Sequence, residues 1–138
     1  LKIYRKDFME DCIFCKIING EIPSTTIYED EVVKVFLDIN PTTNGDSLIV
    51  PKKHFKDIRD IDNKTIEHMN NIVRNLYPIY QKKLHCDGLT IAYNADYGQD
   101  IKHFHMHFIP RYKDDGVQHI KNEKHLKNIE EIAKLLNK

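Results

Sequence analysis

The stretch KHFHMHFIPR, from Lys102 to Arg111, decides how this chain is interpreted. It places His103, His105 and His107 at every second position, with large apolar residues between them. Side chains two residues apart share one face of a β-strand, whereas the same spacing on a helix scatters them around the axis. We therefore expect a strand over residues 103–111, with its apolar residues toward the core and its three imidazole rings on the opposite face.

The spacing alone leaves three interpretations of this histidine face open. A strand can simply carry a polar face, or two of the rings can join a third ligand in a zinc site of the hydrolytic type. A neutral imidazole, whose unperturbed pKa is about 6.5, is also a competent nucleophile when a neighbour holds its second ring nitrogen. His105, the central ring, has a histidine on either side that can do so.

Composition narrows the class of protein. The 138 residues match the size of one domain with its own core, and we expect residues 1–10 to be an N-terminal extension of a single domain over residues 11–138. Basic and acidic residues balance at 21 each, which argues against a nucleic-acid partner, and no apolar run approaches the roughly 20 residues that cross a membrane. An odd number of cysteines, three, argues against a disulfide framework and favours a cytoplasmic location.

The remaining patterns predict an α+β fold. Asp11 can cap a short helix that ends at Gly20, and the apolar spacing of residues 64–84 predicts a long helix. Pro78 lies inside that pattern and is expected to kink or divide the helix near Tyr77. A last amphipathic helix carries Leu126, Ile129, Ile132, Ala133 and Leu136. Besides the histidine strand, we expect strands at residues 25–30, 31–39, 47–51 and 89–94, which together favour an antiparallel sheet with segregated helices.

Four blocks of this sequence, in order, resemble the histidine triad (HIT) superfamily of nucleotide hydrolases and transferases. They are IFCKIINGEIPS (13–24), FLDINPTTNGDSLIVPKKH (36–54), AYNADYGQ (92–99) and GQDIKHFHMHFIPR (98–111). The resemblance implies a HIT-like fold, with about five antiparallel strands, one long helix and one or two shorter ones. It also implies a homodimer.

The implied activity is hydrolysis or transfer at the α-phosphate of a purine nucleotide derivative, of the phosphoramidate or dinucleoside polyphosphate type, through a covalent nucleotidyl-histidine. An alternative is a nucleotide-binding adaptor with weak or vestigial catalysis. By resemblance, His105 is the nucleophile, His107 hydrogen-bonds near the phosphate and His103 completes the triad, while Asp38 binds the ribose hydroxyls. The residues expected near the phosphate and leaving group are Asn94, Gln99 and Asp100, and those expected as apolar walls of the base pocket are Ile13, Phe14, Ile17, Phe36 and Ile39.

Cys12 and Cys15 have the spacing of metal ligands and also of a redox pair. The redox interpretation needs a βαβ context that this part of the chain lacks, and two small packing residues remain an alternative. In resembling proteins, such a pair binds zinc together with an upstream histidine and the first triad histidine. The resemblance thus implies a structural Zn²⁺ site formed by Cys12, Cys15, His54 and His103. Cys86 and the other histidines are interpreted as packing or surface residues.

Asp100 departs from the resembling branches, which carry serine or threonine after Gly98 and Gln99. A serine hydroxyl can donate a hydrogen bond to a phosphate oxygen, whereas an ionised carboxylate can only accept one. Asp100 can be protonated beside the phosphate, because repulsion between the two negative groups raises its pKa, or it can turn away. We expect it to turn away, either to pair with Lys102 or to accept a hydrogen bond from the leaving group. The sequence does not identify that leaving group.

Overall fold

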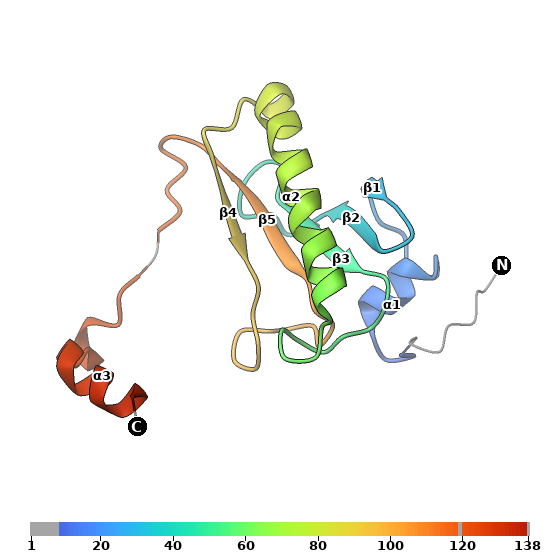
Figure 1. Ribbon diagram of the computed structural model, residues 1–138. Helices are drawn as coiled ribbons and strands as arrows, with labels where there is room; N and C mark the ends of the chain where they lie inside the picture. Colours follow the sequence, from blue (N-terminus) through green and yellow to red (C-terminus); the bar gives the residue numbers. More distant parts are fainter. Residues whose placement is uncertain (1–8, 119, 138) are drawn as a thin grey trace.

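The computed structural model describes residues 9–118 and 120–137, and these form the predicted α+β fold (Figure 1). Five antiparallel strands make one sheet in the order β1-β2-β3-β5-β4. The strands are β1 (Thr26–Glu29), β2 (Val33–Leu37), β3 (Ser47–Pro51), β4 (Gly88–Ala92) and β5 (Met106–Arg111). The helices are α1 (Ile13–Ile18), α2 (Asn63–Leu84), the short 3₁₀ helix η1 (Glu123–His125) and α3 (Ile129–Leu136).

The two faces of the sheet are covered by different helices, because side chains alternate along each strand. On one face, α2 lies across the sheet and packs its buried residues against Val35, Ile49, Met106 and Phe108 (Figure 1). On the other face, α1 packs Phe14, Cys15 and Ile17 against Phe36, Leu48 and Val50. The apolar residues between the histidines therefore face the core under α2, as the period-two spacing predicts.

The histidine strand is shorter than expected, since β5 begins at Met106 and only His107 of the triad lies within it. The cause is the end of the neighbouring strand β3 at Pro51, which has no N–H to continue the ladder. The Pro51 carbonyl instead lies 2.8 Å from Nε2 of His103. The backbone N–H of Phe104 donates to the carbonyl of Phe55, which likewise lies outside the sheet.

Two helix predictions need correction. The N-cap of α1 is Cys12 and not Asp11, because the Cys12 Sγ accepts the backbone N–H of Cys15 at 3.3 Å. Helix α2 runs undivided through Pro78, so the predicted division near Tyr77 is wrong. Pro78 and Arg74 both lie on the exposed side of α2, where water can satisfy the Arg74 carbonyl that loses its helical partner.

The last helix of the described chain, α3, is exposed, unlike the helices that pack on the sheet. Leu126 precedes α3 and is not part of it, and α3 buries none of its residues. Figure 1 shows α3 beyond an extended segment, away from the sheet and α2. None of the described helices combines the length and the apolar character that a bilayer crossing requires.

Candidate active site and metal centre

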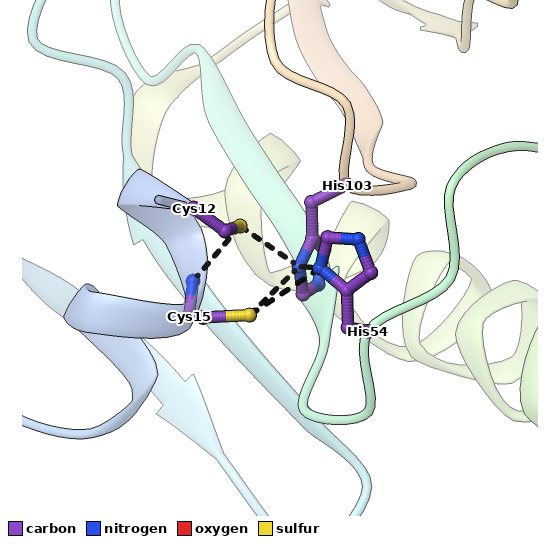
Figure 2. Close-up of side chains that lie close together, drawn as sticks. All are labelled: Cys12, Cys15, His54 and His103. Carbon is purple, nitrogen blue, oxygen red and sulfur yellow. Dashed lines mark hydrogen bonds between the residues drawn. The ribbon is translucent and has the colours of Figure 1, made fainter. Parts of the chain in front are cut away.

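Four ligand-type side chains converge where α1 meets the ends of two strands (Figure 2). Cys12 caps α1 and Cys15 lies in its first turn, His54 follows β3, and His103 precedes β5. One ligand atom from each of these four residues lies within 4.8 Å of all the others. Both cysteines and His103 are buried, and His54 is half-buried. The predicted ligands are thus brought together from three separate parts of the chain.

The distances in this cluster fit a tetrahedral metal ion. Bonds of about 2.0 Å to nitrogen and 2.3 Å to sulfur separate tetrahedral ligands by roughly 3.3–3.8 Å. The observed Sγ to Nδ1 distances are 3.4 Å for Cys12–His103, 3.4 Å for Cys15–His54 and 3.5 Å for Cys15–His103. The two Nδ1 atoms lie 3.1 Å apart. None of the three cysteines, all of which lie in the described part of the chain, forms a disulfide that would compete for these sulfur atoms.

His103 is in the protonation state that a metal ligand needs. A carbonyl oxygen can only accept a hydrogen bond, so the contact with Pro51 places the ring proton on Nε2 and leaves the lone pair on Nδ1. Burial lowers the pKa of His103 to about 4, and the neighbouring His54 and His105 act in the same direction. His103 is therefore neutral at neutral pH, with its free nitrogen toward the two sulfur atoms.

The central histidine is held by the next carbonyl along the chain. The Nδ1 atom of His105 lies 2.7 Å from the backbone carbonyl of His103, which fixes the ring proton on Nδ1 and leaves the lone pair on Nε2. The Phe14 ring meets His105 edge-on, with centroids 4.9 Å apart. Burial lowers the pKa of His105, so the ring is neutral at neutral pH. A neutral, oriented imidazole is suited to nucleophilic attack.

A cavity of about 410 Å³ lies between α1 and the sheet, and His105 and His107 are part of its wall. That volume is within the range of small-molecule sites. Ile13 and Ile39 line the cavity although they are 49% and 100% exposed, so an apolar rim is open to a ligand. The predicted nucleotide-binding residues that line it are Ile13, Phe14, Ile17, Phe36, Asp38, Ile39 and Asp100.

The HIT domain family matches residues 19–114, which is more than half of the sequence. This chain belongs to the HIT family. An uncharacterised HIT-like protein of Methanocaldococcus jannaschii is 46% identical over 109 residues, covering 76% of this chain and 82% of that protein. The adenosine 5'-monophosphoramidase HNT1 of Saccharomyces cerevisiae is 36% identical, covering 72% of this chain and 62% of that enzyme. The adenylylsulfatase HINT3 of Arabidopsis thaliana is 35% identical, covering 83% of this chain and 59% of that enzyme.

Solved HIT structures agree with this fold. A protein from Streptococcus mutans superposes with a TM-score of 0.82 at 32% identity, covering 96% of this chain and 85% of that one. A zinc-bound histidine triad protein from Mycobacterium smegmatis superposes with a TM-score of 0.74 at 34% identity, covering 91% of this chain and 89% of that one.

Three residues assigned by the HIT resemblance do not line the cavity. His103 is fully buried among the four possible metal ligands, and Asn94 is exposed. Gln99 is 3% exposed, and its Nε2 donates to the carbonyl of Lys56 at 2.6 Å. The Oε1 atom of Gln99 is buried without a hydrogen-bond partner. Gln99 is therefore held by the Lys56 carbonyl and not directed into the cavity, while Asn94 lies beside Gly98, which lines it.

Asp100 is exposed and lines the same cavity as His105 and His107. The expected ion pair with Lys102 is absent among the described residues. The Lys102 ammonium donates instead to the backbone carbonyls of Gln99 and Asp96, at 2.7 and 3.2 Å. Accepting a hydrogen bond from the leaving group remains the second expectation for Asp100.

Several cavity residues of this HIT chain are not singled out by the sequence pattern. Leu48 lines the cavity because it pairs with His107 across β3 and β5, a register that strand periodicity alone does not supply. Ser24 follows α1, and its Oγ is buried without a hydrogen-bond partner at the cavity wall. Ser24 could have been found from the sequence by its place at the end of the first HIT block, directly after an Ile-Pro pair.

Proposed function

We propose that this HIT protein cleaves nucleotide derivatives at the α-phosphate and transfers the nucleoside monophosphate to water or to another acceptor. One observation carries the proposal. The hydrogen bond from Nδ1 of His105 to the His103 carbonyl leaves a neutral Nε2 lone pair on a ring that lines the 410 Å³ cavity. Holding one ring nitrogen so that the other can attack is what nucleophilic catalysis by histidine requires.

The cavity is suited to a purine nucleoside. Phe14, Ile17 and Phe36 offer apolar surface to the flat base, and the exposed Ile39 closes over its edge. Asp38 is half-buried and its Oδ1 already accepts the backbone N–H of Asn40, which holds the carboxylate in place for the ribose hydroxyls. The base and ribose are thus bound by residues other than the nucleophile.

The proposed reaction has two steps. The His105 Nε2 lone pair attacks the α-phosphorus, an N–P bond forms, and the bond from phosphorus to the leaving group breaks. The leaving group takes its electron pair and a proton from protonated His107. Water, or another acceptor, then attacks the same phosphorus and gives its proton to His107, the N–P bond breaks, and His105 recovers its neutral state. His107 neighbours His105 with ring centroids 4.9 Å apart, so it is near enough to act as the proton donor in the first step and the proton acceptor in the second.

We further propose that Cys12, Cys15, His54 and His103 hold a structural Zn²⁺. The sulfur and nitrogen donors, their spacing and the neutral His103 support it, and so does the zinc-bound relative from Mycobacterium smegmatis. A bound ion would cross-link α1, the segment after β3 and the segment before β5. Phe14 of α1 contacts the rings of both His103 and His105, so it connects the proposed zinc site to the central histidine.

Two of the relatives are named for cleaving adenylyl derivatives, one an adenosine phosphoramidate, whose leaving group is an amine, and one adenylylsulfate, whose leaving group is sulfate. Both compounds are therefore the first substrates to test.

The experiment compares wild-type protein with His105→Asn and His85→Asn on adenosine phosphoramidate and adenylylsulfate, with AMP release measured by chromatography. His85 ends α2 in the left-handed conformation (φ 58°), which asparagine tolerates, so this variant is a matched control. His105→Asn should lower turnover by roughly 1,000-fold or more while AMP binds with nearly unchanged affinity. AMP binding by wild-type protein with no turnover of either substrate would instead favour the adaptor function.

A further inference from the structure

A buried carboxylate lies at the inner side of the active-site face. Asp46 immediately precedes β3 and is 2% exposed. Its Oδ2 accepts the backbone N–H of Thr42 at 2.8 Å, whereas its Oδ1 is buried and has no hydrogen-bond partner. A buried, unsatisfied acceptor costs about 1–3 kcal/mol, and more when the group is charged. Such an atom needs a partner that the fold brings to it.

The sheet register brings that partner close. Leu48 of β3 pairs with His107 of β5, so their side chains lie on the same face. Because side chains alternate, Asp46 extends from this face as well, while Ser47 points to the opposite face and hydrogen-bonds Tyr80. One carboxylate oxygen of Asp46, one of Asp38 and one ring nitrogen of His107 all lie within 4.8 Å of one another.

The charges around Asp46 favour a proton donor at this position. Burial raises the pKa of Asp46, and the nearby carboxylate of Asp38 raises it further. The Thr42 N–H and a positive charge on His107 act in the opposite direction. Asp46 therefore holds its negative charge best when His107 carries a proton toward it.

We infer that Asp46 is a positioning residue that accepts a hydrogen bond from His107, fixing the ring and favouring its protonated form. The inference rests on the proposed function. In the first step, His107 gives the proton from its other ring nitrogen to the leaving group as the bond to phosphorus breaks. In the second step, His107 takes a proton from the attacking water. Asp46 stays ionised throughout and changes the proton affinity of His107 without touching the substrate.

The same three atoms have the chemistry of a divalent cation site. A bound cation and a hydrogen bond between His107 and Asp46 predict different responses of the His107 ring to added metal. A carboxylate and imidazole set suits Mn²⁺. A cation bound there would occupy the Asp38 carboxylate and the His107 nitrogen, both of which the proposed reaction uses. A hydrogen bond between His107 and Asp46 leaves the Asp38 carboxylate and the other His107 nitrogen available to the substrate. We therefore prefer the hydrogen bond to a bound cation.

The test is Asp46→Asn, which keeps the side chain's shape and can still accept the Thr42 N–H, but loses the charge. Nitrogen-15 NMR of the His107 ring, assigned through the signals lost in His107→Asn, reports the protonation and tautomer of the ring without any substrate. The ring signals should shift toward the neutral form in Asp46→Asn. On the substrates above, kcat should fall about 10-fold or more with KM changed less than threefold. Asp115→Asn, which removes the charge of the half-buried partner of Arg111 at the far end of β5, is the matched control and should leave the His107 signals unchanged.

If Asp46→Asn does not fold, the titration of Asp46 in a His107→Asn variant tests the same hydrogen bond from the other side. The carboxyl carbon of Asp46 should titrate at a higher pH in His107→Asn than in wild-type protein, because the positive partner is lost. Unchanged His107 signals in a folded Asp46→Asn, or an unchanged Asp46 titration in His107→Asn, would overturn the inference. So would selective broadening of the His107 signals by micromolar Mn²⁺ in wild-type protein. Since these readouts need no turnover, a failed assay of the proposed function leaves them intact.

Discussion

The backbone carbonyl of His103 accepts the Nδ1–H of His105 at 2.7 Å, while the ring of His103 belongs to the cluster of four possible metal ligands. One residue therefore connects the two centres of the molecule. The Nε2 of His103 is tied to the Pro51 carbonyl at 2.8 Å, and Nδ1 points at the cysteines. Movement of this residue would displace the acceptor that keeps the His105 proton on Nδ1, so the proposed nucleophile depends on the cluster although none of its own atoms belongs to it.

The first prediction concerns the metal. Cys15→Ser should lower the metal content from about one zinc per chain to nearly none, as measured by mass spectrometry of protein purified without added metal. The melting temperature should fall by roughly 10 °C or more, because the binding energy of a structural zinc is also folding energy. Turnover should fall as well, through the loss of the His103 position.

Cys86→Ser is the matched control, since Cys86 is equally buried but lies in the core under α2, away from the cluster. It should keep its metal and lose only the smaller stability that a buried hydroxyl costs. A Cys15→Ser protein with a full complement of zinc would rule out the proposed ligand set.

The second prediction is a homodimer. Strand β4 ends the sheet order and pairs only with β5 among the described strands, so its outer edge is open. An open edge is prone to pair with another chain, and a two-fold arrangement of two β4 strands closes it. Light scattering should report about twice the chain mass of 16.3 kDa at micromolar concentration. A mass near that of one chain, unchanged across a concentration series, would contradict the prediction.

The third prediction concerns acid stability. In the turn between β1 and β2, Asp30 accepts the backbone N–H groups of Val32 and Val33, and its Oδ2 lies 2.7 Å from Nε2 of His68 on α2. Burial alone would raise the pKa of Asp30, but the hydrogen bonds outweigh it and lower the pKa to about 2. A folded-state pKa below the unfolded value stabilises the fold above about pH 4 and ceases to do so as the pH falls toward 2.

Asp30→Asn should thus be less stable than wild type by about 1–2 kcal/mol at neutral pH, and the gap should close between pH 4 and pH 2. Denaturant unfolding of both proteins at each pH measures the gap, and acid release of metal affects both alike. Glu31→Gln, which changes an exposed carboxylate in the same turn, is the control and should follow wild type throughout. A gap that stays constant down to pH 2 would show that the Asp30 charge does not stabilise the fold.

Local periodicity predicts much of this fold because strands and helices bury residues at fixed spacings. The alternation from His103 to Phe108 is enough to separate the core face from the histidine face, and the spacing of residues 64–84 is enough to find α2. It does not reveal that β5 starts only at Met106, since that depends on Pro51 in a strand more than 50 positions earlier. Asp46 is missed for a similar reason: its partner is set by the pairing of β3 with β5, which no local pattern contains.

The site residues also divide into those that the sequence predicts and those that depend on the folded chain. The family resemblance supplies the four clustered ligands and the apolar wall of the cavity, because these belong to blocks with fixed spacing. It does not supply side-chain direction. Gln99 lies in the expected loop, yet its amide donates to the Lys56 carbonyl, and Lys102 prefers two backbone carbonyls to the carboxylate of Asp100. Both outcomes depend on the hydrogen bonds available in the folded loop.

The last prediction concerns the charge of Asp100 at the cavity wall. Two like charges about 4 Å apart repel by about 4 kcal/mol at an effective dielectric of 20. The Lys102 ammonium is bonded to backbone carbonyls and does not neutralise this carboxylate. Asp100 should therefore disfavour an anionic leaving group and accept a hydrogen bond from one that carries an N–H or a positive charge. Asp100→Ser should raise kcat/KM for diadenosine polyphosphate by about tenfold, and should not raise it for adenosine phosphoramidate.

Asp62→Ser is the matched control, because Asp62 precedes α2 outside the cavity wall and serine is an equally good N-cap. Equal changes on both substrates, or a loss on the polyphosphate, would mean that the Asp100 charge does not select the leaving group.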